Sequence, residues 1–161
     1  MRAGDRHVFD GDDEFAEVRR PTNRPVVPKY HAIEQPLEIK SSLSDLIALA
    51  WEDRGIVADF SIPGDEKQAL RVYFDKTHIV RILDEMPLST ESEGTKSEGL
   101  VSEHFAYIVE DSLFWKSQSE AFKIVFNKAR HYCFITGCTC LDVISDAAPT
   151  IGVTTARRSS P

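Results

Sequence analysis

The sequence predicts an α+β domain, with one antiparallel sheet of five or six strands and two helices packed on it. Several short stretches alternate apolar and polar residues, which is the period of a half-buried strand. Only a few residues separate successive stretches, so they fit antiparallel neighbours and leave no room for crossover helices. Two other stretches repeat apolar residues at helical spacing. A meander, a C-terminal hairpin and two helices together indicate the α+β class.

The clearest strand signal is the hairpin predicted at residues 131–145, which contains all three cysteines of the chain. Its two halves alternate on either side of Gly137. Gly137-Cys138 fits a two-residue type II′ turn, which needs glycine at its first central position. This register places Cys133 opposite Asp142.

Each face of this hairpin carries the same residues in either of two possible registers. A turn at Thr136-Gly137 would place Cys133 opposite Cys140 instead, but threonine resists the positive φ that such a turn demands. The face expected to press on the core carries Tyr132, Phe134, Leu141 and Val143. The opposite face carries His131, Cys133, Cys140 and Asp142, together with Ile135 and Ile144.

Before the hairpin, the chain divides into a leader and a folded domain. Residues 1–40 are predicted to be a disordered leader, because an acidic cluster is followed by prolines that forbid a continuous helix. The alternative is an arm that folds onto the domain or onto a partner through apolar residues such as Tyr30 and Ile33. A single domain is expected over residues 41–154, with a flexible tail at 155–161.

Within the domain, a helix is predicted on each side of the meander strands. The first is expected over residues 43–51, where apolar residues recur at i, i+3, i+4, i+7 and i+8. The second follows a cap at Ser117 or Ser119. Its apolar face carries Ala121, Phe122, Val125, Phe126 and Ala129. Strands are predicted at residues 56–62, 70–74, 77–83 and 100–110.

An acidic segment interrupts these strands. Residues 84–99 show no apolar periodicity and are predicted to be a mobile loop. A solvated loop is the simplest interpretation, and a docking surface for a basic partner is the functional one. The candidate partner-binding residues are Asp84, Glu85, Glu91, Glu93 and Glu98.

The polar face of the hairpin is the second candidate site. A thiol beside an imidazole that a carboxylate orients is the arrangement of a sulfur nucleophile, so Cys133, Cys140, His131 and Asp142 are candidate catalytic residues. Zinc also prefers such atoms, but the spacing Cys-x4-Cys-x-Cys is not a zinc pattern and a hairpin rarely closes four ligands. We therefore expect no metal and no cofactor, and favour cysteines that are buried as small hydrophobic residues.

Composition narrows the possible partners and the compartment. The net charge of −7 opposes binding to nucleic-acid phosphates, and every apolar run is far shorter than the ~20 residues that span a bilayer. An odd number of cysteines, in a chain that starts without a secretory pattern, favours a reducing, cytoplasmic compartment. Motifs typical of nucleotide binding, serine hydrolysis and zinc proteolysis are absent from the sequence.

These features predict a small cytoplasmic acidic protein that docks on a basic protein partner, as immunity proteins and inhibitors do. The alternative is a small enzyme that uses a cysteine nucleophile of the hairpin. The sequence predicts no nucleic-acid partner and no membrane association, and it leaves the oligomeric state open.

Overall fold

The structure, a computed structural model, describes residues 27–53 and 55–156. Five strands form the larger of two sheets: Lys29–Ala32 (β1), Ile79–Asp84 (β5), Ala106–Glu110 (β6), Arg130–Phe134 (β7) and Thr139–Ser145 (β8). Four form the smaller sheet: Leu46–Glu52 (β2), Gly55–Ile62 (β3), Asp65–Phe74 (β4) and Thr150–Thr155 (β9). The helices are Glu85–Glu91 (α1), Leu113–Lys116 (α2), Glu120–Val125 (α3) and a 3-10 turn at Ser41–Leu43 (η1).

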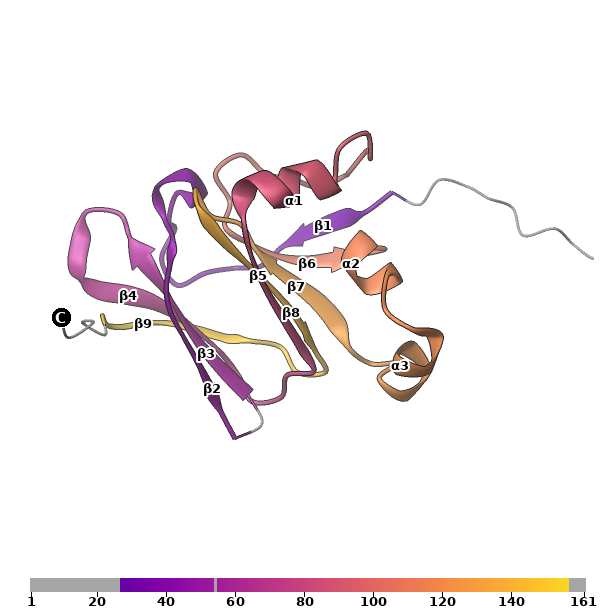
Figure 1. Cartoon of the computed structure of the whole chain (residues 1–161). Helices are drawn as coiled ribbons and strands as arrows, with labels where there is room; N and C mark the ends of the chain where they lie inside the picture. Colours follow the sequence, from indigo (N-terminus) through magenta and orange to yellow (C-terminus); the bar gives the residue numbers. More distant parts are fainter. Residues whose placement is uncertain (1–26, 54, 157–161) are drawn as a thin grey trace, which may run out of the picture.

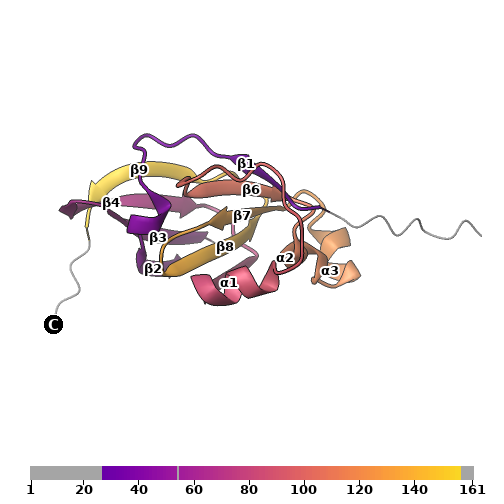
Figure 2. The ribbon, with the colours of Figure 1, turned by 90° about the horizontal axis from the view of Figure 1, so that it is seen from above.

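The two antiparallel sheets lie face to face (Figures 1 and 2). Their strand orders are β1-β6-β7-β8-β5 and β2-β3-β4-β9. A fold made mostly of antiparallel strands with a few helices agrees in outline with the α+β expectation. The details differ, because the described residues contain two sheets with nine strands and three short α-helices, rather than one sheet of five or six strands and two helices.

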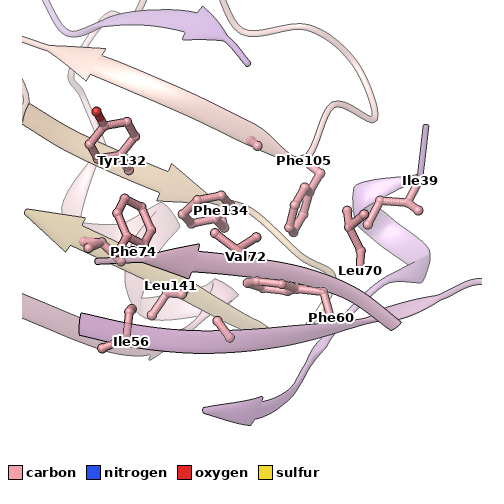
Figure 3. Packing of buried hydrophobic residues seen from close by; sticks show 13 residues of the cluster. Ile39, Ile56, Phe60, Leu70, Val72, Phe74, Phe105, Tyr132, Phe134 and Leu141 are labelled. Carbon is pink, nitrogen blue, oxygen red and sulfur yellow. The ribbon is translucent and has the colours of Figure 1, made fainter. Parts of the chain in front are cut away.

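Aromatic side chains fill the core between the sheets (Figure 3). Phe60 of β3 and Phe105 beside β6 meet edge to face, with ring centroids 4.6 Å apart. Phe134 of β7 lies 5.5 Å from Phe105 and 5.7 Å from Phe60. All three rings are fully buried, and burying one such side chain stabilises the fold by roughly 1.5–3 kcal/mol. This contact joins the two sheets.

The β7–β8 hairpin has the predicted register, with Cys133 opposite Asp142. The predicted core face is also confirmed, since its side chains lie in the cluster between the sheets: Tyr132, Phe134, Leu141 and Val143. The predicted type II′ turn is wrong, because Gly137 is not among the glycines with positive φ. A Cβ atom at Gly137 would instead lie 2.5 Å from the carbonyl oxygen of Ser42, so the close approach of η1 requires glycine there.

The helix predicted over residues 43–51 is wrong, because most of this stretch forms the edge strand β2. Its pairing with β3 shifts at an irregularity between Leu46 and Ala48. Leu46 and Leu49 consequently both pack against the core, although they lie three residues apart. A bulge in a strand can therefore imitate the apolar spacing of a helix.

The second predicted helix exists but is shorter and less buried than expected. The Ser119 hydroxyl accepts a hydrogen bond from the N–H of Phe122 and caps α3, as predicted. The helix ends at Val125, whose side chain is 69% exposed. The rings of Phe122 and Phe126 pack against each other and against His78. The predicted apolar face is therefore not buried as one unit.

The acidic segment at residues 84–99 contains a helix, so the prediction of a loop without structure is wrong there. Asp84 caps α1, and its carboxylate accepts a hydrogen bond from the N–H of Met86 at 3.0 Å. Further along, the carbonyl oxygen of Glu98 accepts from the N–H of Tyr30 in β1 at 2.8 Å. The segment is thus tied to the fold at both ends.

The ends of the domain also differ from the prediction. The sequence places residues 1–40 in a leader, but β1 lies within this range and pairs with β6. Ile33 packs against the core, as the alternative of an arm folded on the domain implies. Residues 1–26 and 157–161 lie outside the described residues, so their disorder stays a prediction. The sequence pattern did not reveal β9, which pairs with β4.

Candidate functional site

Three of the four predicted hairpin residues lie together on the face of the larger sheet that is turned away from the smaller sheet. His131 and Cys133 lie two residues apart in β7, and Asp142 lies opposite Cys133 in β8. Their exposed fractions are 6%, 2% and 1%. Strand alternation places them on one face, because their neighbours point into the core.

Asp142 is the centre of this group. Its Oδ1 accepts a hydrogen bond from Nε2 of His131 at 2.9 Å. Its Oδ2 accepts two from Arg81, from Nε at 2.8 Å and from Nη2 at 2.6 Å. Arg81 lies opposite Asp142 in β5, so three adjacent strands supply the group. We call His131, Cys133, Asp142 and Arg81 the Asp142 cluster.

Arg81 connects the Asp142 cluster to the helices that cover it. Its Nη1 donates to the carboxylate of Glu91, at the end of α1, at 3.0 Å. Its guanidinium carbon lies 4.0 Å from the ring centre of Phe114 in α2. The Phe114 ring also meets the His131 ring edge to face, with centroids 5.3 Å apart. The sequence did not identify Arg81 as a site residue, although its charge interrupts an apolar run at residues 79–83.

The cluster holds an ionised carboxylate and a protonated thiol. Burial opposes ionisation of Asp142, but the hydrogen bonds and charges of His131 and Arg81 outweigh it and lower the pKa of the carboxyl below its ordinary value. Burial, together with the neighbouring Asp142 carboxylate, raises the pKa of the Cys133 thiol well above its ordinary value. A cysteine nucleophile acts as the thiolate, so this environment disfavours nucleophilic chemistry at Cys133.

The other two cysteines lie at the hairpin turn. Cys140 is buried, and its Sγ accepts a hydrogen bond from the backbone N–H of Thr136 at 3.4 Å. Burial raises the pKa of the Cys140 thiol as well. Cys138 is exposed. The structure thus brings His131, Cys133 and Asp142 together and leaves Cys140 in the packing of the turn.

A small pocket reaches the Asp142 cluster from solvent. It is lined by the cluster, by Tyr30 of β1 and by residues of the covering segments, among them Leu88, Thr95 and Phe114. It leaves about 40 Å³ of free volume, which admits an ion or water molecules. Sites for small-molecule substrates are typically about 300–1,000 Å³, so the pocket does not fit a metabolite.

The predicted partner-binding residues lie on and around α1, but they differ in role. Asp84, Glu85, Glu93 and Glu98 are exposed to solvent. The carboxylate of Glu91 instead forms the ion pair with Arg81 and keeps 33% of its side chain exposed. Glu91 therefore links the two candidate sites, which the sequence presents as separate.

The Asp142 cluster also contains three side chains that can bind a metal. A nitrogen of His131, the sulfur of Cys133 and an oxygen of Asp142 all lie within 4.8 Å of one another, and no other such group of His, Cys, Asp and Glu occurs in the described part of the chain. Nδ1 of His131 is buried without a hydrogen-bond partner. These are ligand types that zinc prefers.

No protein-family model, curated protein or solved structure matches this chain. Among the described residues, no helix has both the length and the apolar character needed to cross a membrane. Function is therefore argued from the geometry of the sites themselves.

Proposed function

We propose that the protein is a small cytoplasmic acidic protein that docks on a basic protein partner. The proposed contact is the acidic docking surface, which we define as Asp84, Glu85, Glu93 and Glu98 around α1. One observation carries the proposal: these four exposed carboxylates lie at the start of α1 and in the segment that follows it, and α1 is fixed to the sheet beneath it.

Both ends of α1 are held in place. Asp84 caps its first turn, and Glu91 in its last turn pairs with Arg81, which Asp142 holds in turn. A surface that is already ordered loses less conformational entropy when a partner binds. The anchored helix supports a docking role better than a mobile loop would.

The surface also has free charge and an exposed apolar side chain. Met86, in the first turn of α1, is 71% exposed. Within the described part of the chain, Glu85, Glu93 and Glu98 form no ion pair. Interfaces often place methionine or aromatic residues at their centre and polar residues at their rim. A partner with basic residues around an apolar patch would complement this arrangement.

The alternative of a cysteine enzyme receives less support. The hydrogen bond between His131 and Asp142, beside Cys133, does resemble the layout of a nucleophile with its base. However, the imidazole bonds the carboxylate, the pKa of the thiol is raised rather than lowered, and the pocket is small. We therefore assign the Asp142 cluster to the anchoring of α1 and α2.

The docking proposal can be tested by neutralising the surface without changing its shape. Glu85→Gln, Glu93→Gln and Glu98→Gln, introduced together, should slow association about tenfold at low salt and leave dissociation nearly unchanged, because rim charges act mainly on the encounter rate. A pull-down from the native host first identifies the partner, and surface plasmon resonance then measures both rates at two salt concentrations.

A matched control removes three exposed carboxylates elsewhere: Glu34→Gln, Glu38→Gln and Glu66→Gln. Both triple variants raise the net charge by the same amount, so only a local effect separates them. Equal recovery of the same proteins by both variants and by wild type would exclude α1 as the docking surface.

A further inference from the structure

We propose that His131, Cys133 and Asp142 together bind one divalent metal ion of the zinc type. This inference goes beyond the docking function and does not depend on it, because the acidic docking surface supplies none of the three ligands. The ion would lie between β7 and β8, beneath the α1 and α2 segments that line the pocket.

The first argument is the donor set and its rigidity. An imidazole nitrogen, a sulfur and a carboxylate oxygen within 4.8 Å of one another match the ligands of three-residue zinc sites. The hairpin register and burial fix all three side chains. A site that is already assembled needs little further ordering when the ion binds, and the fourth position remains for water in the pocket.

The second argument is the imidazole of His131. Nε2 bonds the carboxylate of Asp142, whereas Nδ1 is buried and has no hydrogen-bond partner. A buried polar atom without a partner is uncommon, and it calls for a water, an ion or a functional role. Because Nε2 and Oδ1 of Asp142 lie 2.9 Å apart, an ion that replaces the proton between them would bind both side chains. The ring proton would then lie on Nδ1, where no other group is bonded.

The third argument is charge. Of the three side chains in the two ion pairs of Arg81, Arg81 contributes +1 and Asp142 and Glu91 contribute −1 each, so their sum is −1. Coordination by Cys133 replaces the thiol proton with the ion, and this proton leaves to solvent. The exchange adds one positive charge, which offsets the negative sum of these side chains and holds the ion by electrostatic attraction.

Arg81 does not block such a site. Both of its hydrogen bonds to Asp142 go to Oδ2, whereas Oδ1 accepts the hydrogen bond from His131. Carboxylates that bind metals are commonly held by a second partner on their other oxygen. Arg81 would serve as this partner and keep Asp142 oriented.

The test is titration of the full chain with cobalt and zinc. The protein is stripped with a chelator and titrated with Co²⁺, whose bond to a thiolate gives a charge-transfer band in the near ultraviolet. We expect about one equivalent of metal per chain, the tetrahedral visible bands of a site of the zinc type, release of one proton, and competition by Zn²⁺. X-ray absorption of the zinc-loaded wild type should show one sulfur at about 2.3 Å and lighter atoms at about 2.0–2.2 Å.

Two cysteine variants locate the ion. Cys138→Ser changes an exposed thiol of the same hairpin and should keep the band, whereas Cys133→Ser should lose it. Wild-type protein that is folded but shows neither the band nor sulfur scattering would overturn the proposal. A band that persists in Cys133→Ser, or one that disappears in Cys138→Ser, would overturn it too. If Cys133→Ser fails to fold, X-ray absorption of Cys138→Ser decides, because loss of sulfur scattering there places the ion at the turn.

Discussion

The two faces of the β7–β8 hairpin are both buried, but different forces hold them. Phe134 and Leu141 on the inner face are fully buried among apolar side chains, so removal of apolar surface from water stabilises them. Asp142 on the outer face is just as inaccessible, at 1% exposure, yet it is charged. Its desolvation is offset only because His131 and Arg81 use both carboxylate oxygens.

This difference predicts how each face responds to change. The inner face should tolerate substitutions that keep apolar volume, since close packing is its main requirement. The outer face should tolerate few substitutions that remove one partner and leave the other, since each of its polar groups depends on another. Apolar packing on the inner face of the β7–β8 pair therefore stabilises the fold, whereas the outer face holds the ionisable side chains.

The largest effect is expected on the inner face. Phe134→Ala should lower the free energy of unfolding by about 3–5 kcal/mol, because it removes a fully buried ring and leaves a cavity. Leu141→Met, which nearly conserves volume, should cost less than about 1.5 kcal/mol. Urea denaturation measures both. A neutral Phe134→Ala would mean that the apolar core does not depend on this face.

A somewhat smaller effect is expected at the centre of the outer face. Asp142→Asn should cost about 3 kcal/mol, at the lower end of the range for breaking a buried ion pair, because Arg81 keeps 27% of its side chain exposed. Arg81→Met combined with Asp142→Asn should cost less than the sum of the two single changes, since the carboxylate and the guanidinium that pair with each other are then removed together. Additive costs would contradict the pairing.

The same carboxylate makes the stability of the outer face depend on pH. Because the folded pKa of Asp142 lies below its ordinary value, its contribution is fully present above the unfolded pKa of about 3.9 and is lost as the pH falls through the folded pKa. The advantage of wild type over Asp142→Asn, measured in the presence of a chelator, should therefore shrink below about pH 4. Phe134→Ala provides the contrast, since its cost should not follow this titration.

Local patterns predicted the hairpin well, because alternation fixes which side chains share a face. The same reasoning failed at β2, where the shift between Leu46 and Ala48 produces apolar spacing that resembles a helix. It also failed at the turn, where the approach of Ser42 to Gly137 comes from a segment far away in the sequence. Alternation of apolar and polar residues predicts the structure correctly only where the strand is regular and no distant segment of the chain fixes the backbone.

The candidate site shows the same limit. Strand alternation grouped His131 with Cys133, and the predicted register added Asp142. Arg81 was not predictable in this way, because it lies 61 residues from Asp142 and the chain must first pair β5 with β8. The link from Arg81 to Glu91 was hidden for the same reason. Cysteine spacing likewise gave no metal pattern, since the three possible ligands come from two strands.

The smallest effect on stability is expected at the turn, and it tests whether the outer face is closed to solvent. Cys138 is exposed, whereas Cys133 and Cys140 are buried with raised thiol pKa values. In native protein a disulfide reagent should modify Cys138 rapidly, and the other two only as the fold opens. Cys138→Ser should abolish the rapid phase and change the free energy of unfolding by less than about 0.5 kcal/mol.

A second rapid thiol in the native protein would contradict the closed outer face. If that thiol were Cys133, the covering segments would open readily, and the ion pair between Arg81 and Glu91 would not hold α1 against the sheet. The docking surface would then be mobile, and a cysteine nucleophile would regain support, because its sulfur would meet water and substrate. Mass spectrometry of the labelled peptides identifies which thiol reacts, and so decides between an anchored helix and an accessible thiol.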